Sequence, residues 1–187
     1  MTMPPGNWQP FFEHVRTEFG RLTVIEQRWL EDRVQKIARF QLAIDQLFQA
    51  VQGGKICKVC GGACCDSGRH HLSLANLLGL LFANASPPTP DFSRGCPFVG
   101  DDGCLLAIPH RPYNCITFFC DSLDNRMTAE QRTLLANHDR ALRAEYTAIA
   151  QRYEAAGLGR LWLTLNRLGW RSIFRRRPDH VVDFKNH

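Results

Sequence analysis

All eight cysteines of the chain lie between residues 57 and 120, and their spacing suits a metal site. The first four occur in CKVCGGACC, and the others follow within GCPFVGDDGCLLAIPHRPYNCITFFC. Cysteine thiolates are preferred ligands of zinc and of iron–sulfur clusters. We therefore take the whole set as candidate metal ligands, namely Cys57, Cys60, Cys64, Cys65, Cys96, Cys104, Cys115 and Cys120.

The first four cysteines indicate different roles within one short stretch. Cys57 and Cys60 have the C-x2-C spacing, in which a tight turn directs both sulfurs to one metal. Two glycines follow, and residues without a Cβ let the backbone turn closely, which favours a knuckle over a regular helix. Neighbouring side chains of extended backbone diverge, so Cys64 and Cys65 are expected to act separately. Either one could join the knuckle, while the other binds a second metal, stays a buried thiol or supplies redox chemistry.

The distal cysteines lie in turns that prolines restrict. Pro97, Pro109 and Pro112 lower the cost of ordering this backbone around a metal. Mixed coordination by His70, His71 or His110 stays open, although histidines in such positions are more often hydrogen-bonding groups. Asp101 and Asp102 suit a turn before Gly103 rather than a catalytic pair. Arg111 suits a salt bridge.

These motifs together resemble a known family. CxxC followed by CC, then CPF, then a cysteine before RPxxC is similar to the YkgJ-like cysteine-cluster proteins, which are described as zinc- or iron-chelating and often as iron–sulfur proteins. The resemblance covers residues 57–120. It matches the first seven cysteines to those of the family and Cys120 to one found in a subset. The chain departs from the pattern in having three residues between Cys60 and Cys64, and Ile116 where an arginine is common.

All-sulfur coordination suits both metals, but the compact spacing and the resemblance favour an iron–sulfur cluster over Zn²⁺. The predicted function is a metal-binding protein with a structural, redox or metal-transfer role. Two alternatives stay open: a cluster-dependent group-transfer or redox enzyme, and a zinc-stabilised adaptor whose arginine-rich segment, residues 160–177, binds an acidic partner. Whether the protein is an enzyme is left undecided, because no nucleophile and base can be paired from the sequence.

Composition sets the class of protein. With 187 residues and 44% hydrophobic content, we expect a single domain with its own core, spanning residues 1–187. The formal charge of +5 falls once thiolates bind metal, so a nucleic-acid partner is not expected. No basic and apolar leader or apolar run of about 18 residues is present, which predicts a cytoplasmic protein without a transmembrane segment. Thiols stay reduced in that compartment.

The elements that must position the cysteines are predicted to be mainly α-helical. Within the single domain we expect N-terminal helices over 1–54, a loop-rich cysteine-cluster region with short helices over 55–121, and C-terminal helices with a basic tail over 122–187. Apolar spacing predicts one long amphipathic helix over 24–52 that stops at Gly53 and Gly54.

Residues that cap or end helices predict further helices. A shorter helix with Pro10 in its first turn is expected to end at Gly20, and residues 72–84 form another that the proline run 86–90 ends. Thr128 and Gln131 fit a capping box, from which a second long helix continues to Gly157. The two long helices are expected to run antiparallel. In residues 160–177 the leucines should face the core and the arginines solvent.

Overall fold

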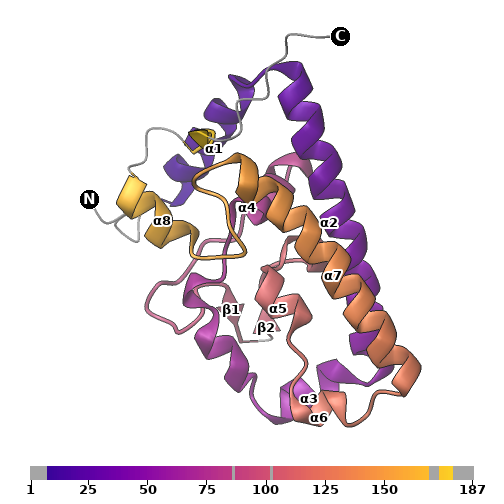
Figure 1. Ribbon diagram of the computed structural model, residues 1–187. Coiled ribbons are helices and arrows are strands. Elements are labelled where there is room, and N and C mark those ends of the chain that lie inside the picture. Colours follow the sequence, from indigo (N-terminus) through magenta and orange to yellow (C-terminus); the bar gives the residue numbers. More distant parts are fainter. Residues whose placement is uncertain (1–7, 86, 102, 169–172, 179–187) are drawn as a thin grey trace.

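Two long antiparallel helices, α2 (Val24–Ala50) and α7 (Ala129–Arg152), frame the molecule (Figure 1). The computed structural model describes residues 8–85, 87–101, 103–168 and 173–178. Thr23 caps α2 by accepting a hydrogen bond from the Glu26 amide, and the predicted capping box of Thr128 and Gln131 begins α7. The mainly α fold and both long helices are as predicted.

Apolar faces of these helices enclose a third. Leu30, Val34, Ile37 and Ile44 of α2 are buried against Leu142, Tyr146 and Ile149 of α7 and against α4 (Leu74–Phe82). Ser73 caps α4 in a capping box with Asn76, and almost every residue of α4 is buried because helices cover it on several sides. This is the main core of the molecule.

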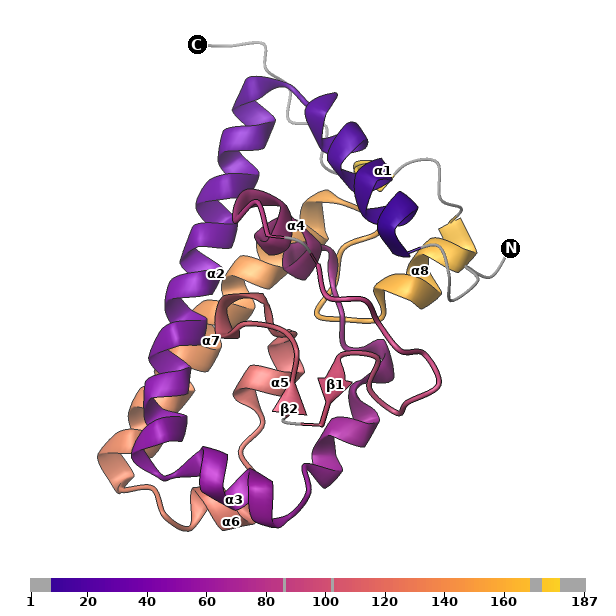
Figure 2. The ribbon, with the colours of Figure 1, turned by 180° about the vertical axis from the view of Figure 1, so that it is seen from behind.

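Helices α1 (Trp8–Gly20) and α8 (Leu161–Leu168) lie on the other side of α4 (Figure 2). Their aromatic side chains interlock: the ring centroids of Trp8 and Trp162 are 5.5 Å apart, and those of Phe11 and Trp162 are 5.1 Å apart. Aromatic contacts of this kind add to the stabilisation from burial. The helix with Pro10 and Gly20 near its ends was predicted. Helix α8 buries Leu161 and Leu165 as expected, whereas Leu163 is exposed.

The end of α2 differs from the prediction that Gly53 and Gly54 stop it. The helix ends at Ala50, and Gln52 takes the left-handed conformation with a φ of 58°. Both glycines instead begin α3 (Gly53–Val59). A Cβ on Gly53 would lie 2.3 Å from the Phe48 ring, so glycine is required here for close packing.

Short elements make up most of the cysteine-rich region. They are the 3₁₀ helices η1 (Ala63–His70) and η2 (Ile108–His110), the strands β1 (Val99–Gly100) and β2 (Gly103–Cys104), and the helices α5 (Tyr113–Thr117) and α6 (Asp121–Asp124). The strands pair antiparallel with Val99 opposite Cys104, which leaves a two-residue connection at the predicted turn. Residue 102 of that turn lies outside the described residues.

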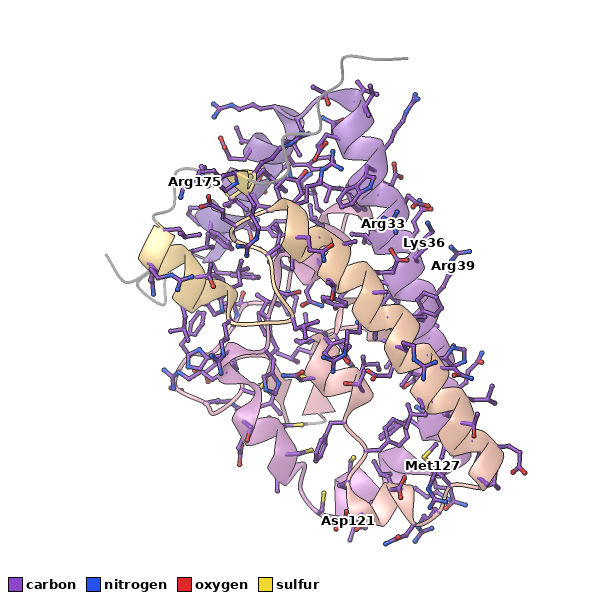
Figure 3. All side chains as sticks on the ribbon, viewed as in Figure 1. Arg33, Lys36, Arg39, Asp121, Met127 and Arg175 are labelled. Atoms are coloured by element: carbon purple, nitrogen blue, oxygen red, sulfur yellow. The ribbon has the colours of Figure 1, made fainter. Side chains whose placement is uncertain are left out.

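A second, smaller hydrophobic cluster forms where α3 and α6 meet. Val51, Leu123 and Met127 are its buried members, and we call it the lower cluster. Figure 3 shows Met127 and Asp121 at this end of the molecule, and Arg175 at the opposite end. Ile56, Phe119 and Cys120 pack against the lower cluster, so it supports one part of the cysteine region separately from the main core.

The buried carboxylate of Glu26 connects α2 to the end of α7 and to the C-terminal segment. Glu26 of α2 accepts hydrogen bonds from Arg152 (2.6 Å), Tyr153 and Arg176 (2.6 Å), and only 3% of its side chain is exposed. Tyr153 pairs with Arg176 in an isolated β-bridge, so α7 ends at Arg152 rather than at the predicted Gly157. None of the helices in the described ranges has both the length and the apolar character needed to span a membrane.

Candidate metal centre

The eight cysteines reach the site from several short elements. Cys57 lies in α3, Cys64 and Cys65 in η1, Cys104 in β2 and Cys115 in α5, whereas Cys96 lies in the loop before β1. Cys60 and Cys120 are the residues that cap α3 and α6. All eight are free thiols.

The C-x2-C pair does not form the predicted knuckle. Cys57 is inside a regular helical turn, and Cys60 follows the last helical residue, with its amide bonded to the Ile56 carbonyl. The Cys60 thiol donates to the Cys57 carbonyl at 3.4 Å. The predicted tight turn comes one residue later, at Gly61 and Gly62, which have φ values of 67° and 68°. Helix α3 takes precedence because its apolar side packs on the lower cluster.

Four thiols lie in or at the ends of α3, η1 and α6, and we call them the lower thiol group: Cys57, Cys60, Cys64 and Cys120. Burial raises the pKa of the Cys57 thiol, and negative charge on the other three members would raise it further. Each of the three is close enough for its charge to act on Cys57. Cys120 also packs on the lower cluster beside Ile56, the residue before Cys57.

The other four thiols gather beneath the main core, and we call them the upper thiol group: Cys65, Cys96, Cys104 and Cys115. Burial raises the pKa of Cys65 to about 11, and charge on Cys64, Cys104 and Cys96 adds to the increase. Burial likewise raises the pKa of Cys115, with further contributions from Cys104, Cys96 and Cys65. Cys115 keeps exposed surface, although burial is the largest cause of the rise in its thiol pKa.

Backbone contacts bring this group together. The loop before β1 lies against η1 so closely that a Cβ on Gly95 would be 2.6 Å from the Asp66 carbonyl oxygen. The Leu105 amide donates to the Phe98 carbonyl at 2.9 Å, which brings Cys104 back beside the Cys96 loop. Cys96 and Cys104 both pack against the main core.

Gly68 provides a test of this packing. A Cβ at Gly68 would lie 2.8 Å from the Cys96 sulfur and 3.0 Å from its Cβ, so Gly68→Ala must displace Cys96. We expect a loss of about 1–3 kcal/mol in the free energy of unfolding, the usual cost of overpacking, measured by thermal or urea unfolding. Gly54→Ala is the matched control, because nothing lies within 4 Å of a Cβ there. Equal stability of the two variants would contradict the close contact.

The three histidines have different environments. His71 Nδ1 is 3.3 Å from the Cys115 sulfur, and burial, followed by the charge of His70, lowers its pKa. His70 itself is exposed. Burial also lowers the pKa of His110, whose Nδ1 is buried without a hydrogen-bond partner. His71 is therefore the histidine that contacts a candidate ligand, and a neutral imidazole there can donate to the sulfur.

Arg111 lies near both thiol groups. Its positive charge lowers the pKa of Cys57 in the lower group and of Cys115 in the upper group, opposing the larger effect of burial. Its Nε donates to the Leu106 carbonyl at 3.1 Å. The salt bridge expected from the sequence is not found, since Arg111 makes no ion pair within the described part of the chain.

Buried polar residues hold the Arg111 backbone in place. Its carbonyl accepts hydrogen bonds from Gln41 of α2 at 2.5 Å and from Asn76 of α4 at 2.8 Å, and Asn76 also contacts the Tyr146 hydroxyl of α7. Gln41 and Asn76 were not predicted as residues of the site. The available signal was a polar amide at an otherwise apolar helix position, because a buried amide requires hydrogen-bond partners.

Across the described ranges, no set of three or more histidine, cysteine, aspartate or glutamate side chains has the arrangement of a metal site. No family model, curated protein or solved structure matches the chain. The resemblance of residues 57–120 to the YkgJ-like proteins therefore stays a prediction, as does the identity of the metal.

Proposed function

We propose that the protein binds metal through its cysteines, as an iron–sulfur cluster or as Zn²⁺, in a structural, redox or metal-transfer role. The observation that carries this proposal is that five short elements and one loop bring all eight thiols into one region of the molecule, where several of them act electrostatically on one another. Folding orders loops that would otherwise keep more conformational freedom, and metal ligation stabilises such an arrangement. The donor set fits either metal, because both take tetrahedral thiolate coordination.

The electrostatics of the thiols support ligation over thiol catalysis. A catalytic cysteine usually has a lowered pKa, which favours the reactive thiolate. Burial instead raises the pKa of Cys57, Cys65, Cys96 and Cys115, and neighbouring thiols add to the effect. A bound cation offsets the cost of gathering thiolate charge. The compact spacing of Cys57 to Cys65, together with the family resemblance, favours iron–sulfur chemistry over zinc.

Anaerobic purification followed by metal analysis tests the proposal. We expect about one equivalent or more of iron or zinc per chain, because four thiolates suffice for either kind of centre. A brown protein with broad visible charge-transfer absorption would identify iron–sulfur, and a colourless one zinc. Less than about half an equivalent of any metal, with all eight thiols reduced and intact, would contradict metal binding.

The adaptor alternative has less support. Arg175 donates to Glu154 at 2.7 Å, Arg176 donates to Glu26 at 2.6 Å, and Arg177 donates to the Ala150 carbonyl at 2.7 Å. These arginines are exposed, as expected, but each also bonds to the protein itself. An acidic partner would have to compete with these contacts. Residues 169–172 of the same segment lie outside the described ranges.

A cluster-dependent enzyme is the second candidate, and Arg111 is the observation that favours it. This half-buried guanidinium lies beside the thiols without a carboxylate partner among the described residues. A guanidinium in such a position can hold an anionic group. Binding of a small anion that disappears in Arg111→Gln, while the metal content stays unchanged, would favour an enzyme over a purely structural centre.

A further inference from the structure

We infer that Cys57 and Cys60 form a reversible dithiol–disulfide pair, which a small-molecule disulfide such as glutathione disulfide oxidises. This covalent modification site does not depend on the proposed function, because the bond closes without metal. While the bond is closed, neither sulfur can act as a thiolate ligand. The support for the pair is the geometry of the end of α3, where both residues lie.

A glycine cap fixes the backbone that carries both cysteines. The Gly62 amide donates to the Cys57 carbonyl at 3.0 Å. The Gly61 amide donates to the Lys58 carbonyl at 3.4 Å, and Gly61 has a left-handed φ of 67°. These two bonds make the Schellman pattern that ends many helices. Cys60 is the capping residue of α3, so its Cα lies one helical turn beyond that of Cys57.

The spacing of this pair suits a disulfide. In a helix, Cα atoms three residues apart are separated by about 5 Å, within the range of roughly 4.4–6.8 Å that disulfides span. A helical side chain leans toward the turn before it, so Cys60 leans toward Cys57. Its sulfur accordingly lies 3.4 Å from the Cys57 carbonyl oxygen. The adjacent Cys64 and Cys65 fit less well, because neighbouring Cα atoms are only about 3.8 Å apart.

Closing the bond requires the last turn of α3 to tighten. Cβ atoms three residues apart in an α-helix are separated by about 5–6 Å, whereas a disulfide brings them to about 4 Å. A 3₁₀ turn aligns side chains three residues apart, and helix ends often adopt one. The bond from Gly61 back to Lys58 already has this spacing. The turn has room to tighten, since Val59 is 90% exposed and nothing lies within 4 Å of a Cβ at Gly61.

The different exposure of the two thiols sets the order of the reaction. Cys60 is exposed and Cys57 is half-buried, so Cys60 reacts first. Its sulfur attacks glutathione disulfide, which forms a mixed disulfide and releases one glutathione. The Cys57 sulfur then attacks the Cys60 sulfur, which closes the bond between them and releases the second glutathione. The two thiol protons and two electrons of the protein end on the two glutathione molecules.

Treatment of the reduced full chain with glutathione disulfide tests the pair. A chelator keeps bound metal from covering the thiols, and circular dichroism establishes that the helices remain. After the free thiols are blocked, mass spectrometry should show the loss of two hydrogen atoms and no bound glutathione. Trypsin cleaves after Lys55 and Lys58, so the new bond should join the peptides 56–58 and 59–69. Excess glutathione should reverse the reaction.

Single substitutions separate the roles of the two thiols. Cys57→Ser should keep one glutathione on Cys60, because the second thiol that would displace it is gone. Cys60→Ser should form no bond between the two peptides. Cys64→Ser and Cys65→Ser are the matched controls, since they remove the other thiols of peptide 59–69 and should form the bond as wild type does.

The contribution of the fold is measured by unfolding the chain. Folding already fixes the backbone between Cys57 and Cys60, whereas the unfolded chain must order it when the bond closes. The equilibrium constant for closure against glutathione should therefore be at least about tenfold larger in the folded chain than in urea. Gly61→Ala should lower the constant of the folded chain about fivefold relative to Gly54→Ala, because only position 61 has the left-handed conformation.

Three results would overturn the inference. The first is a wild-type chain that keeps glutathione on Cys60 or stays fully reduced. The second is a bond that still joins the two peptides in Cys60→Ser. The third is an equal equilibrium constant in the folded chain and in urea, which would assign closure to sequence spacing alone. None of them changes the metal content of the anaerobically purified protein, so failure of the pair and failure of the proposed function are measured separately.

Discussion

Chelation of the metal is expected to lower the free energy of unfolding of the native protein by about 4 kcal/mol, when free metal is first held about 1,000-fold above its Kd. For a chain of this size, that loss corresponds to a fall in Tm of roughly 8–16 °C. The physical reason is that distant segments would form the proposed site in the native state, whereas the unfolded chain would not. Thermal unfolding with and without a strong chelator measures the change.

The loss should be concentrated in the short elements. Helices α2, α4 and α7 bury apolar side chains against one another without using the thiols, so their amides should stay protected from hydrogen exchange. Helices α3, η1, α5 and α6 are short and carry the cysteines, so their amides should exchange faster after chelation.

The double variant Cys60→Ser and Cys104→Ser is the control for chelation. Its Tm should not respond to the chelator, because each thiol group has lost a ligand. Equal Tm values for metal-loaded and chelated wild-type protein would contradict a stabilising role for the centre. Such a result is distinct from failure to bind metal, because metal analysis of the loaded sample reports binding directly.

The helical frame could be predicted because its signals are local. The capping box at Thr128 and apolar side chains at helical spacing predicted the long helices and their buried faces, and the structure adds caps at Thr23 and Ser73. The ends were less accurate. Helix α7 stops before Gly157 because Tyr153 turns into a β-bridge with Arg176 and bonds to Glu26, and those partners are far away in sequence.

The candidate site was only partly predictable for the same reason. Residue type and spacing identify the cysteines, but which thiols are neighbours depends on how η1, β2, α5 and α6 pack together. Because Cys64 and Cys65 are adjacent, the sequence predicted that their environments differ. It did not predict which other thiols lie near each of them. For Arg111 a salt bridge was predicted, because a guanidinium group in a protein usually has an acidic partner. Its backbone is instead held by Gln41 and Asn76, which lie on separate helices.

Glu26→Gln is expected to destabilise the fold by about 3 kcal/mol, the lower end of the range for breaking a buried ion pair. The carboxylate is 3% exposed and faces both Arg152 and Arg176, so the substitution leaves two cations without their counter-charge. The cost is at the lower end because Arg176 is 39% exposed and keeps access to water. Urea unfolding near neutral pH measures the loss.

Asp32→Asn is the matched control on the same helix. Asp32 pairs with Lys36 one turn away at 2.6 Å, and both side chains are substantially exposed, so its loss should change stability little. Comparable destabilisation by the two substitutions would contradict a special role for the buried carboxylate.

The pH dependence separates charge from packing. Burial raises the pKa of Glu26, but hydrogen bonds from Arg152 and Tyr153 and the charges of Arg152 and Arg176 together outweigh it, so the folded-state pKa lies below the usual 4.5. A lowered pKa means that this stabilisation is fully present above about pH 4.5 and is lost as the pH falls through the folded-state value. The stability difference between wild type and Glu26→Gln should therefore be constant near neutral pH and shrink in acid, because protonated Glu26 resembles glutamine. A difference that persists unchanged in acid would assign the effect to packing instead of charge.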